Sequence, residues 1–155
     1  MVTESISEKE KLRYVVVTGG NAGIGKALCK QLVTDHNCKV FMGSRSLERG
    51  TQALKEIISH SPKCQGMIQV IQLDVSDEKS VLTAAIEIKG KLGDAKLYGL
   101  VNNAGVMSGV SKEVLIKTNF YGPKYMTEAF VPLICPNQGR IVNMGSGLGP
   151  NFVAK

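Results

Sequence analysis

The sequence predicts one α/β domain, a Rossmann doubly wound parallel sheet with helices on both faces, and three observations carry this prediction. Short apolar runs typical of buried parallel strands recur along the chain. Amphipathic stretches with helical spacing lie between them, and a glycine-rich turn follows the first run. Strict alternation of strands and helices requires crossover connections, and right-handed crossovers pack each helix back onto the sheet. We therefore expect a three-layer α/β/α domain with the strand order 3-2-1-4-5.

The apolar runs predict five strands, over residues 14–17, 40–42, 67–73, 97–101 and 140–144. Apolar residues that recur at steps of three, four or seven positions predict the helices between them. These residues are Ile24, Leu28 and Leu32 in the first helix, Leu47, Leu54, Ile57 and Ile58 in the second, Val81, Ala85, Ile88 and Leu92 in the third, and Met126, Phe130 and Leu133 in a fourth that begins near Lys112. Residues 1–12 are then an N-terminal extension, and residues 13–155 form the domain.

Length and composition bound the class of protein. The 155 residues, 43% of them apolar and 21% charged, are typical of one globular domain with a real core. The net charge of +6 suits a phosphate-bearing ligand, whereas scattered basic residues and few aromatic ones do not favour nucleic acid. The four cysteines show no metal-ligand spacing and are expected to be reduced thiols of a cytoplasmic protein. No apolar run approaches the roughly 20 residues that span a bilayer, so no membrane contact is expected.

The junction between the first strand and the first helix is the most informative place in the sequence. There the run Thr18-Gly-Gly-Asn-Ala-Gly-Ile-Gly25 leads directly into a helix. Gly19 would let the chain turn off the strand, Gly23 would let a pyrophosphate approach the backbone, and Gly25 would let helix and sheet pack closely. Free N–H groups at the helix start would hold the phosphate charge. The alternative is an ordinary tight turn that uses its glycines for geometry alone.

This loop resembles the cofactor loop of the short-chain dehydrogenase/reductase family, and three later segments resemble the family in the same order. They are Asn102-Asn-Ala-Gly105, Asn119 in the next helix, and Ser146 after the fifth strand. Carbonyl reductases are the most similar subgroup by their loop, by Ser44-Arg45 with Arg49-Gly50, and by the segments 117–122 and 138–143. The resemblance covers about residues 15–149 and implies cofactor contacts from Thr18, Gly19, Asn21, Gly23, Ile24 and Gly25.

The charge of the second strand's end predicts which cofactor binds. In a dinucleotide fold, a carboxylate about 20 residues past the glycine loop reads the ribose of NAD, whereas an arginine accommodates the 2′-phosphate of NADP. Twenty positions past Gly25 stands Arg45, and no acidic residue lies between Val40 and Leu47. Ser44 would add a hydroxyl to the same phosphate. We therefore predict NADP(H), the alternative being that Arg45 is a solvated residue at the start of the second helix.

Two further strand ends are expected to contact the cofactor. The resemblance implies that Asp74 bonds the adenine amino group and that the backbone of Val75 lines the ring, although Asp74 could instead cap the helix that starts near Ser76. After the fourth strand, Asn103, Ala104 and Gly105 offer small residues where the ribose or adenine could lie. Alternatively, one or both asparagines, Asn102 and Asn103, stabilise neighbouring strands through side-chain hydrogen bonds.

The resemblance also implies the chemistry, which is hydride transfer between a nicotinamide and the carbonyl of a small-molecule substrate. Ser146 would hydrogen-bond the carbonyl oxygen as a catalytic residue. Asn119 would anchor a water in a proton relay through a locally distorted helix, an irregularity that the nearby Gly122 and Pro123 favour. Aldehydes, quinones or ketones are the substrate classes that the resemblance suggests, and it leaves the oligomeric state open.

The residues that complete the family's chemistry are missing from the sequence. The family uses a tyrosine followed four positions later by a lysine, and no tyrosine in this sequence has a lysine at that spacing. We therefore expect the N-terminal part of a carbonyl-reductase-like enzyme, which binds NADPH weakly and does not turn over. Two alternatives are a non-catalytic dinucleotide-binding module that senses redox state or binds a partner, and a methyltransferase-like domain that opens with a similar glycine-rich turn.

Overall fold

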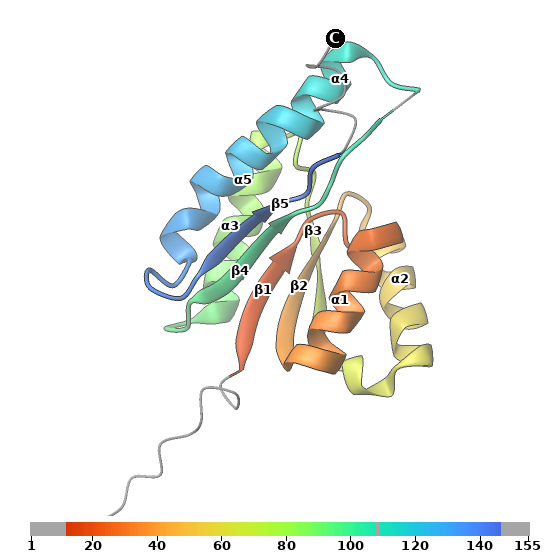
Figure 1. The fold of residues 1–155 in the computed structure, drawn as a ribbon, viewed down its shortest axis with the longest axis vertical. Helices are drawn as coiled ribbons and strands as arrows, with labels where there is room; N and C mark the ends of the chain where they lie inside the picture. The colour runs from red at the N-terminus through yellow and green to blue at the C-terminus, as the bar shows by residue number, and fades with distance from the viewer. Residues whose placement is uncertain (1–11, 108, 147–155) are drawn as a thin grey trace, which may run out of the picture.

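A computed structural model describes residues 12–107 and 109–146. Its centre is one parallel five-stranded sheet with the order β3-β2-β1-β4-β5 (Figure 1). The strands are β1 (Arg13–Val17), β2 (Cys38–Ser44), β3 (Ile68–Gln72), β4 (Leu97–Asn102) and β5 (Arg140–Asn143). The predicted doubly wound sheet and its strand order are confirmed. The β2 strand extends two residues beyond each end of the apolar run that predicted it, because Cys38 and Lys39 pair with β1 and Gly43 and Ser44 pair with β3.

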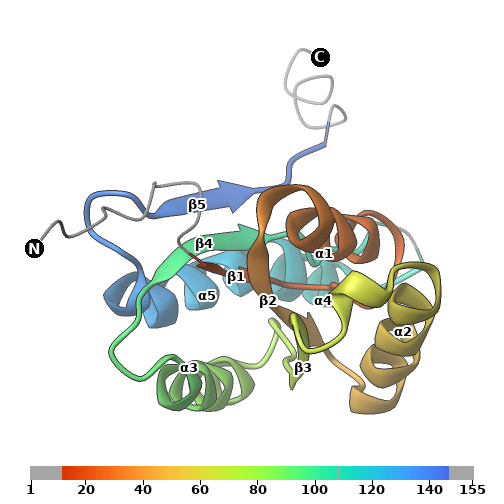
Figure 2. The same ribbon diagram turned by 90° about the horizontal axis from the view of Figure 1, so that it is seen from below.

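The helices cover both faces of this sheet. The α1 and α2 helices pack on one face, and α3 and α5 pack on the other (Figure 2). The regular helices are α1 (Gly23–His36), α2 (Leu47–His60), α3 (Glu78–Leu92), α4 (Lys112–Ile116) and α5 (Gly122–Phe130). Three short turns complete the described elements: the 3₁₀ turns η1 (Pro62–Cys64) and η3 (Val131–Leu133), and the π-helical turn η2 (Lys117–Tyr121) between α4 and α5.

Alternate residues of each central strand supply the two cores. Val16 of β1 belongs to the core under α3 and α5, whereas its neighbours Val15 and Val17 belong to the core under α1 and α2. This division follows from the pleat, because successive side chains of a strand point to opposite faces. Both faces of the central strands are buried, which explains why these strands read as continuous apolar runs rather than alternating ones.

The predicted buried face is correct for α3 and wrong for α1. All four residues predicted for α3, from Val81 to Leu92, are buried. In α1 the buried residues are Gly25, Cys29 and Val33, one position beyond the predicted set, and Ile24 is 68% exposed. The reason is steric: a methyl group on Gly25 would lie 2.4 Å from the carbonyl oxygen of Gly19. The helix therefore turns Gly25 toward the strand ends, and this rotation determines which residues of the following turns are buried.

The long helix after β4 is irregular, as predicted. Residues 117–121 form the π-helical turn η2, so the chain passes from α4 to α5 with one wider turn. Such turns arise as single insertions in α-helices and are frequent at functional sites. Gly122 follows the turn closely packed against the side chain of Val75, which a methyl group at Gly122 would approach to 2.9 Å.

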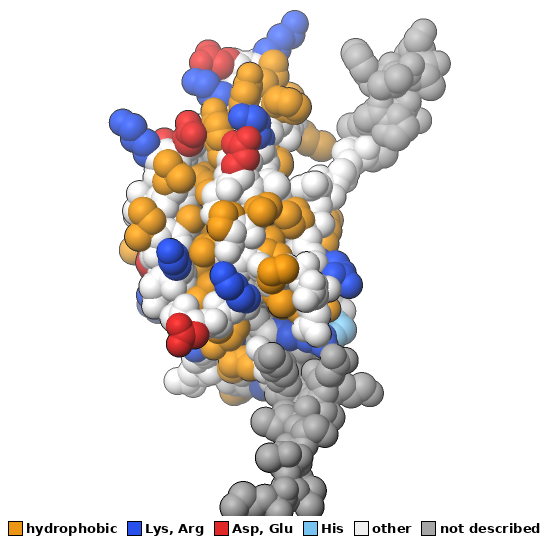
Figure 3. Space-filling model, turned by 90° about the vertical axis from the view of Figure 1, so that its left-hand side faces the viewer, with side chains coloured by type: hydrophobic (Ala, Val, Ile, Leu, Met, Phe, Trp, Pro, Cys, Tyr) orange, Lys and Arg blue, Asp and Glu red, His pale blue; other side chains and the backbone are white. Residues whose placement is uncertain are grey.

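The last strand differs from the other four because its side chains are exposed. Apolar side chains gather on the face of the molecule that carries α5 and β5 (Figure 3). The exposed apolar residues there are Phe120, Val131, Ile141, Val142 and Met144. In the part of the chain that the structure describes, no helix is long and apolar enough to cross a membrane, and no group of three potential metal ligands occurs. Cys29, Cys38 and Cys64 are buried free thiols.

Candidate functional site

The glycine loop between β1 and α1 is shaped for close approach of a ligand. Gly19 and Gly23 both have positive φ angles, 63° and 51°, which a side chain would strain. No atom lies within 4 Å of the position that a methyl group on Gly23 would occupy, so the backbone there is open. The N–H of Gly20 donates to the carbonyl of Gly43 at 2.9 Å and ties the loop to β2. The loop is therefore held at its base and open at its tip.

The start of α1 leaves its first N–H groups available. Its N-cap residue, Ala22, makes no side-chain hydrogen bond, and the first turn contains no acidic residue. The first four N–H groups of a helix have no partner inside the helix, and with the helix dipole they attract anions. Ile24, at the second position of the helix, is exposed beside them. This end of α1 is thus suited to a phosphate.

The side chain of Thr18 is buried beneath the loop and bonds to the protein backbone rather than facing a ligand. Its side chain is 1% exposed, and its hydroxyl donates to the carbonyl of Val101 at 3.4 Å. The same oxygen accepts the N–H groups of Asn103 at 3.0 Å and Ala104 at 2.9 Å. One buried hydroxyl therefore joins the end of β1 to the end of β4, where it satisfies two backbone donors.

Asn103 adds further bonds between the ends of β1 and β4, and we call the bonds of Thr18 and Asn103 together the β1–β4 brace. Its side-chain amide donates to the carbonyls of Thr18 at 2.9 Å and Gly19 at 3.3 Å. The same nitrogen would lie 2.5 Å from a methyl group on Gly25, so the glycine is required for the fit between helix and loop. The structure thus shows Asn103 stabilising the neighbouring segments, the alternative that the sequence left open. Ala104 packs beside Gly19, and the next residue, Gly105, is exposed.

The end of β2 separates its two predicted cofactor residues. Ser44 is buried, and its hydroxyl donates to the carbonyl of Ser46 at 2.7 Å, so its single proton is used within the chain. Arg45 is exposed. The Ser46 hydroxyl caps α2 by accepting the N–H of Arg49 at 3.2 Å. Of the two, only Arg45 extends into solvent at the start of α2.

A hollow of about 370 Å³ lies between the glycine loop and α2. It is lined by Asn21, Glu48, Arg49, Gln52, Ala53 and Glu56. Lys26 of α1 pairs with Glu56 across it, and this hydrogen bond lowers the pKa of the Glu56 carboxyl below its ordinary range. The hollow brings Asn21 beside Arg49, which the sequence singled out only as part of the carbonyl-reductase resemblance. The position of Arg49 in the first turn of the second helix could have indicated that it lies at the same end of that helix as Arg45.

The end of β3 holds a tight turn built by Asp74. One carboxylate oxygen of Asp74 accepts the N–H of Ser76 at 3.0 Å and the Ser76 hydroxyl at 2.7 Å. The cap of α3 is Asp77, which accepts the N–H of Lys79 at 3.0 Å. The alternative that Asp74 caps this helix is therefore wrong, because the N-cap is Asp77, three residues later. Val75 is buried, so it offers a ligand its backbone and not its side chain.

Asn119 lies in the π-helical turn and clamps the loop after β4. Its amide oxygen accepts the N–H of Val106 at 2.9 Å, and its amide nitrogen donates to the carbonyl of Val106 at 2.7 Å. Both polar groups of the side chain are thus bonded to one backbone residue. The bonds to Val106 use one donor and one acceptor site of this amide, so the loop fixes the orientation of the side chain.

A second hollow, of about 570 Å³, lies beside this turn, between α5 and the ends of β4 and β5. Its lining includes Asn102, Asn103, Gly105, Asn119, Asn143 and Met144. Ser146 is exposed, three residues past the end of β5, and is not among the lining residues. The carboxyl ends of the strands therefore carry two hollows, one on each side of the β1–β4 brace. This is the edge of a doubly wound sheet where ligands bind.

Comparison with known proteins assigns this arrangement to a family. The short chain dehydrogenase family model matches residues 13–155. The chain belongs to the short-chain dehydrogenase family. Membership confirms the resemblance, and it means that the methyltransferase-like alternative is wrong.

Two curated relatives illustrate the match to this family. The chain is 35% identical over 168 residues to a (+)-neomenthol dehydrogenase of Arabidopsis thaliana, which covers 91% of this chain and 56% of the relative. It is 33% identical over 148 residues to carbonyl reductase [NADPH] 1 of Macaca fascicularis, with 89% of this chain and 50% of the relative covered. The chain thus spans 56% and 50% of the lengths of these two relatives, or about half of each.

Solved structures of the family agree with the fold. Menthone neomenthol reductase from Mentha piperita superposes with a TM-score of 0.79 at 32% identity, and the match covers 89% of this chain and 62% of that one. A metagenomic short-chain oxidoreductase in complex with NADP superposes with a TM-score of 0.73 at 27% identity, with 86% and 62% covered. Structural neighbours within the family have therefore been solved with NADP bound.

Proposed function

We propose that the chain forms the NADPH-binding part of a short-chain reductase that transfers hydride to the carbonyl of a small molecule. The observation that carries the proposal is the open backbone of Gly23 at the uncapped start of α1, with a hollow lined by Arg49 beside it. A phosphate at the helix start and a second phosphate beside an arginine match a 2′-phosphorylated dinucleotide. Relatives with reductase and dehydrogenase names favour an oxidoreductase over a non-catalytic module.

The two sides of the β1–β4 junction have different tasks in this proposal. The N–H groups of α1 bind the pyrophosphate, while Arg45 and Arg49 neutralise the 2′-phosphate. NADPH, when bound, supplies the hydride. Ser146 donates a hydrogen bond to the substrate's carbonyl oxygen, where negative charge develops. Asn119 keeps the loop after β4 in place through Val106, and the backbone of its turn anchors the water of a proton relay.

A titration with NADPH and NADH tests the cofactor part of the proposal. We expect NADPH to bind at least 10-fold more tightly than NADH, because the arginines meet a charge that NADH lacks. The double variant Arg45→Ala/Arg49→Ala should weaken NADPH binding by about 10- to 100-fold and leave NADH binding within about twofold. Arg140→Ala, an exposed arginine on β5, is the matched control and should change neither affinity. Equal affinities for the two cofactors in the unsubstituted chain would contradict the proposal.

A turnover assay with NADPH and menthone tests the chemical part. We expect no measurable oxidation of NADPH by the 155-residue chain, because no tyrosine in it precedes a lysine by four positions. The substrate class we propose for the complete enzyme is a small ketone or aldehyde, by analogy with the names of the relatives. Turnover by the 155-residue chain at an ordinary enzymatic rate would show that another group supplies the proton.

A further inference from the structure

Two asparagines close the ends of β4 and β5. Asn102 is only 4% exposed and follows the buried residues Leu100 and Val101. Burying an amide is costly unless it is hydrogen-bonded, and Asn102 donates to the amide oxygen of Asn143 at 2.8 Å. The two residues are register partners in the parallel ladder, and the N–H of Met144 donates to the carbonyl of Asn102 at 3.0 Å. Side chain and backbone of Asn102 thus both hold the end of β5.

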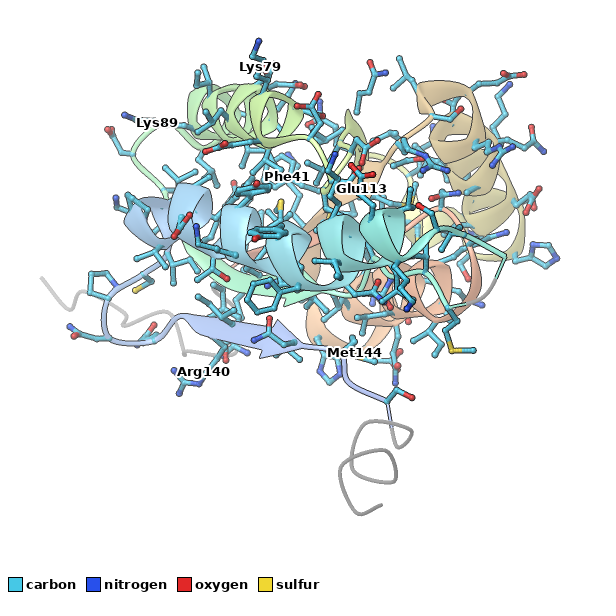
Figure 4. The ribbon with its side chains drawn as sticks, turned by 90° about the horizontal axis from the view of Figure 1, so that it is seen from above. Phe41, Lys79, Lys89, Glu113, Arg140 and Met144 are labelled. Atoms are coloured by element: carbon cyan, nitrogen blue, oxygen red, sulfur yellow. The ribbon has the colours of Figure 1, made fainter. Side chains whose placement is uncertain are left out.

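Little else holds this end of the strand. All four residues of β5 are exposed, and β5 pairs on one side only, with β4. Arg140 and Met144, which mark its two ends, lie at the outer edge of the fold (Figure 4). The Arg140 side chain bonds the carbonyl of its own neighbour, Gly139. Among the described residues, the Asn102–Asn143 bond is therefore the one side-chain hydrogen bond that joins β5 to another strand.

The buried amide of Asn102 depends on this single bond for its orientation. Its oxygen is buried and has no hydrogen-bond partner among the described residues. A buried side chain with one polar group bonded and the other unpartnered is held by the first bond alone. Removing the acceptor on Asn143 would leave the whole Asn102 amide unsatisfied. The position of the Asn102 amide therefore depends on one atom of the edge strand, Oδ1 of Asn143.

We propose that Asn143 is a positioning residue for the nicotinamide half of the site. Each half of a doubly wound sheet binds one nucleotide of the cofactor, and β4 and β5 belong to the second half. The Asn102–Asn143 bond fixes the end of β5, and with it the segment that reaches Ser146 three residues later. The inference rests on the proposed function, because it assigns Ser146 and the nicotinamide to this end of the sheet.

Paired variants at position 143 test the proposal. Asn143→Leu keeps the volume and removes the acceptor, whereas Asn143→Asp keeps an acceptor for Asn102. In Asn143→Leu we expect the Met144 and Ser146 amides to exchange hydrogen about 3- to 10-fold faster, as the loss of one hydrogen bond allows. We also expect the emission of bound NADPH, which reports the surroundings of its nicotinamide, to change while its dissociation constant stays within twofold. Asn143→Asp should restore both readouts.

The outcomes separate a positioning role from a merely structural one. Arg140→Leu, on the same exposed strand, is the control and should behave like the unsubstituted chain. Unchanged exchange in Asn143→Leu, or equal behaviour of Asn143→Leu and Asn143→Asp, would overturn the proposal. Faster exchange with unchanged NADPH emission would overturn the positioning role and leave a structural bond. Failure of the proposed function would appear separately, as absence of NADPH binding by the unsubstituted chain, and the positioning role would then fall with it whatever the exchange rates show.

Discussion

The two strand junctions that flank β4 are built in opposite ways. At the β1–β4 junction, Thr18 and Asn103 join the two chain segments by five hydrogen bonds from inside the protein. At the β4–β5 junction, one side-chain bond joins Asn102 to Asn143 on a strand whose residues are all exposed. Side chains from both segments bond across the first junction, whereas a single side-chain hydrogen bond crosses the second.

This difference between the junctions indicates which part of the site is preformed. The glycine loop needs no ligand to keep its shape, because five hydrogen bonds of Thr18 and Asn103 hold its base, and preorganised sites bind with less ordering cost. The end of β5 lacks such a brace in the described residues. We therefore expect the β1–β4 junction to carry the cofactor-binding capacity of the described chain, and substitutions at that junction to cost more stability than substitutions in β5.

Thr18→Val should have the largest effect, because it breaks the brace and keeps the volume. The substitution leaves the part-buried N–H group of Ala104 without its acceptor, which costs about 1–3 kcal/mol, and the N–H of Asn103 keeps only its second acceptor, the carbonyl of Val101. We expect the free energy of unfolding, measured by urea denaturation, to fall by about 3 kcal/mol. Thr18→Ser retains the hydroxyl and should lose only about 1 kcal/mol, the contribution of one methyl group. A loss in Thr18→Val no greater than in Thr18→Ser would show that the brace does not carry the junction.

Gly25→Ala should come next, because the added methyl group meets backbone. It would lie 2.4 Å from the carbonyl oxygen of Gly19 and 2.5 Å from the Asn103 amide, and overpacking of this kind costs about 1–3 kcal/mol. The matched control is Gly90→Ala in α3, where no atom lies within 4 Å and alanine should stabilise the helix by up to about 1 kcal/mol. Thermal unfolding of the two variants therefore should move in opposite directions. Shifts of the same sign would contradict the close packing of α1 on the loop.

The sequence was sufficient to predict the fold because its signals are local and repeated. Apolar runs mark strands that are buried on both faces, and the glycine loop marks a junction where a side chain on Gly25 cannot fit. The buried face of α1 could not be predicted in the same way. Ile24 has the spacing of a buried helical residue, yet its side chain is exposed. The rotation of the helix is decided by the close approach of Gly25 to Gly19, which is a contact across the loop.

Roles within the site were harder to predict than its place. Ser44 and Asp74 both stand at strand ends, where the sequence predicts ligand contacts, yet their polar atoms bond Ser46 and Ser76 within the chain. Such local side-chain bonds compete with any ligand, and sequence spacing does not reveal which partner is used. Asn119 shows the converse: its π-helical turn followed from nearby Gly122 and Pro123, while its clamp on Val106 appears only in three dimensions.

The same substitution in the two regions gives a smaller, direct comparison. Val17 of β1 is 0% exposed and Val142 of β5 is 46% exposed. Val17→Ala removes two buried carbon atoms and leaves a cavity, so the free energy of unfolding should fall by about 2 kcal/mol. Val142→Ala should change the free energy of unfolding by no more than about 0.5 kcal/mol. Equal losses in the two variants, measured by urea denaturation, would show that β5 is covered in solution.

The smallest expected effect is a pH dependence from the thiol beneath the glycine loop. Cys29 lies so close to the loop that a methyl group on Gly20 would approach its sulfur to 3.0 Å, and burial raises the pKa of Cys29 from 9.0 to about 12. Above pH 9 the unfolded chain releases this proton and the folded chain keeps it. The contribution of Cys29 to stability is therefore complete below pH 9 and is lost progressively as the pH rises toward 12.

Urea denaturation at pH 8 and pH 10 checks this sign. We expect the difference in unfolding free energy between the unsubstituted chain and Cys29→Ala to shrink by about 1 kcal/mol between the two values, because one pKa unit corresponds to 1.36 kcal/mol. Val17→Ala, which removes apolar volume from the same core and no titrating group, should differ from the unsubstituted chain by the same amount at both pH values. If the Cys29→Ala difference also stays constant, water reaches the thiol, and the region under the loop is more open than the brace of Thr18 and Asn103 implies.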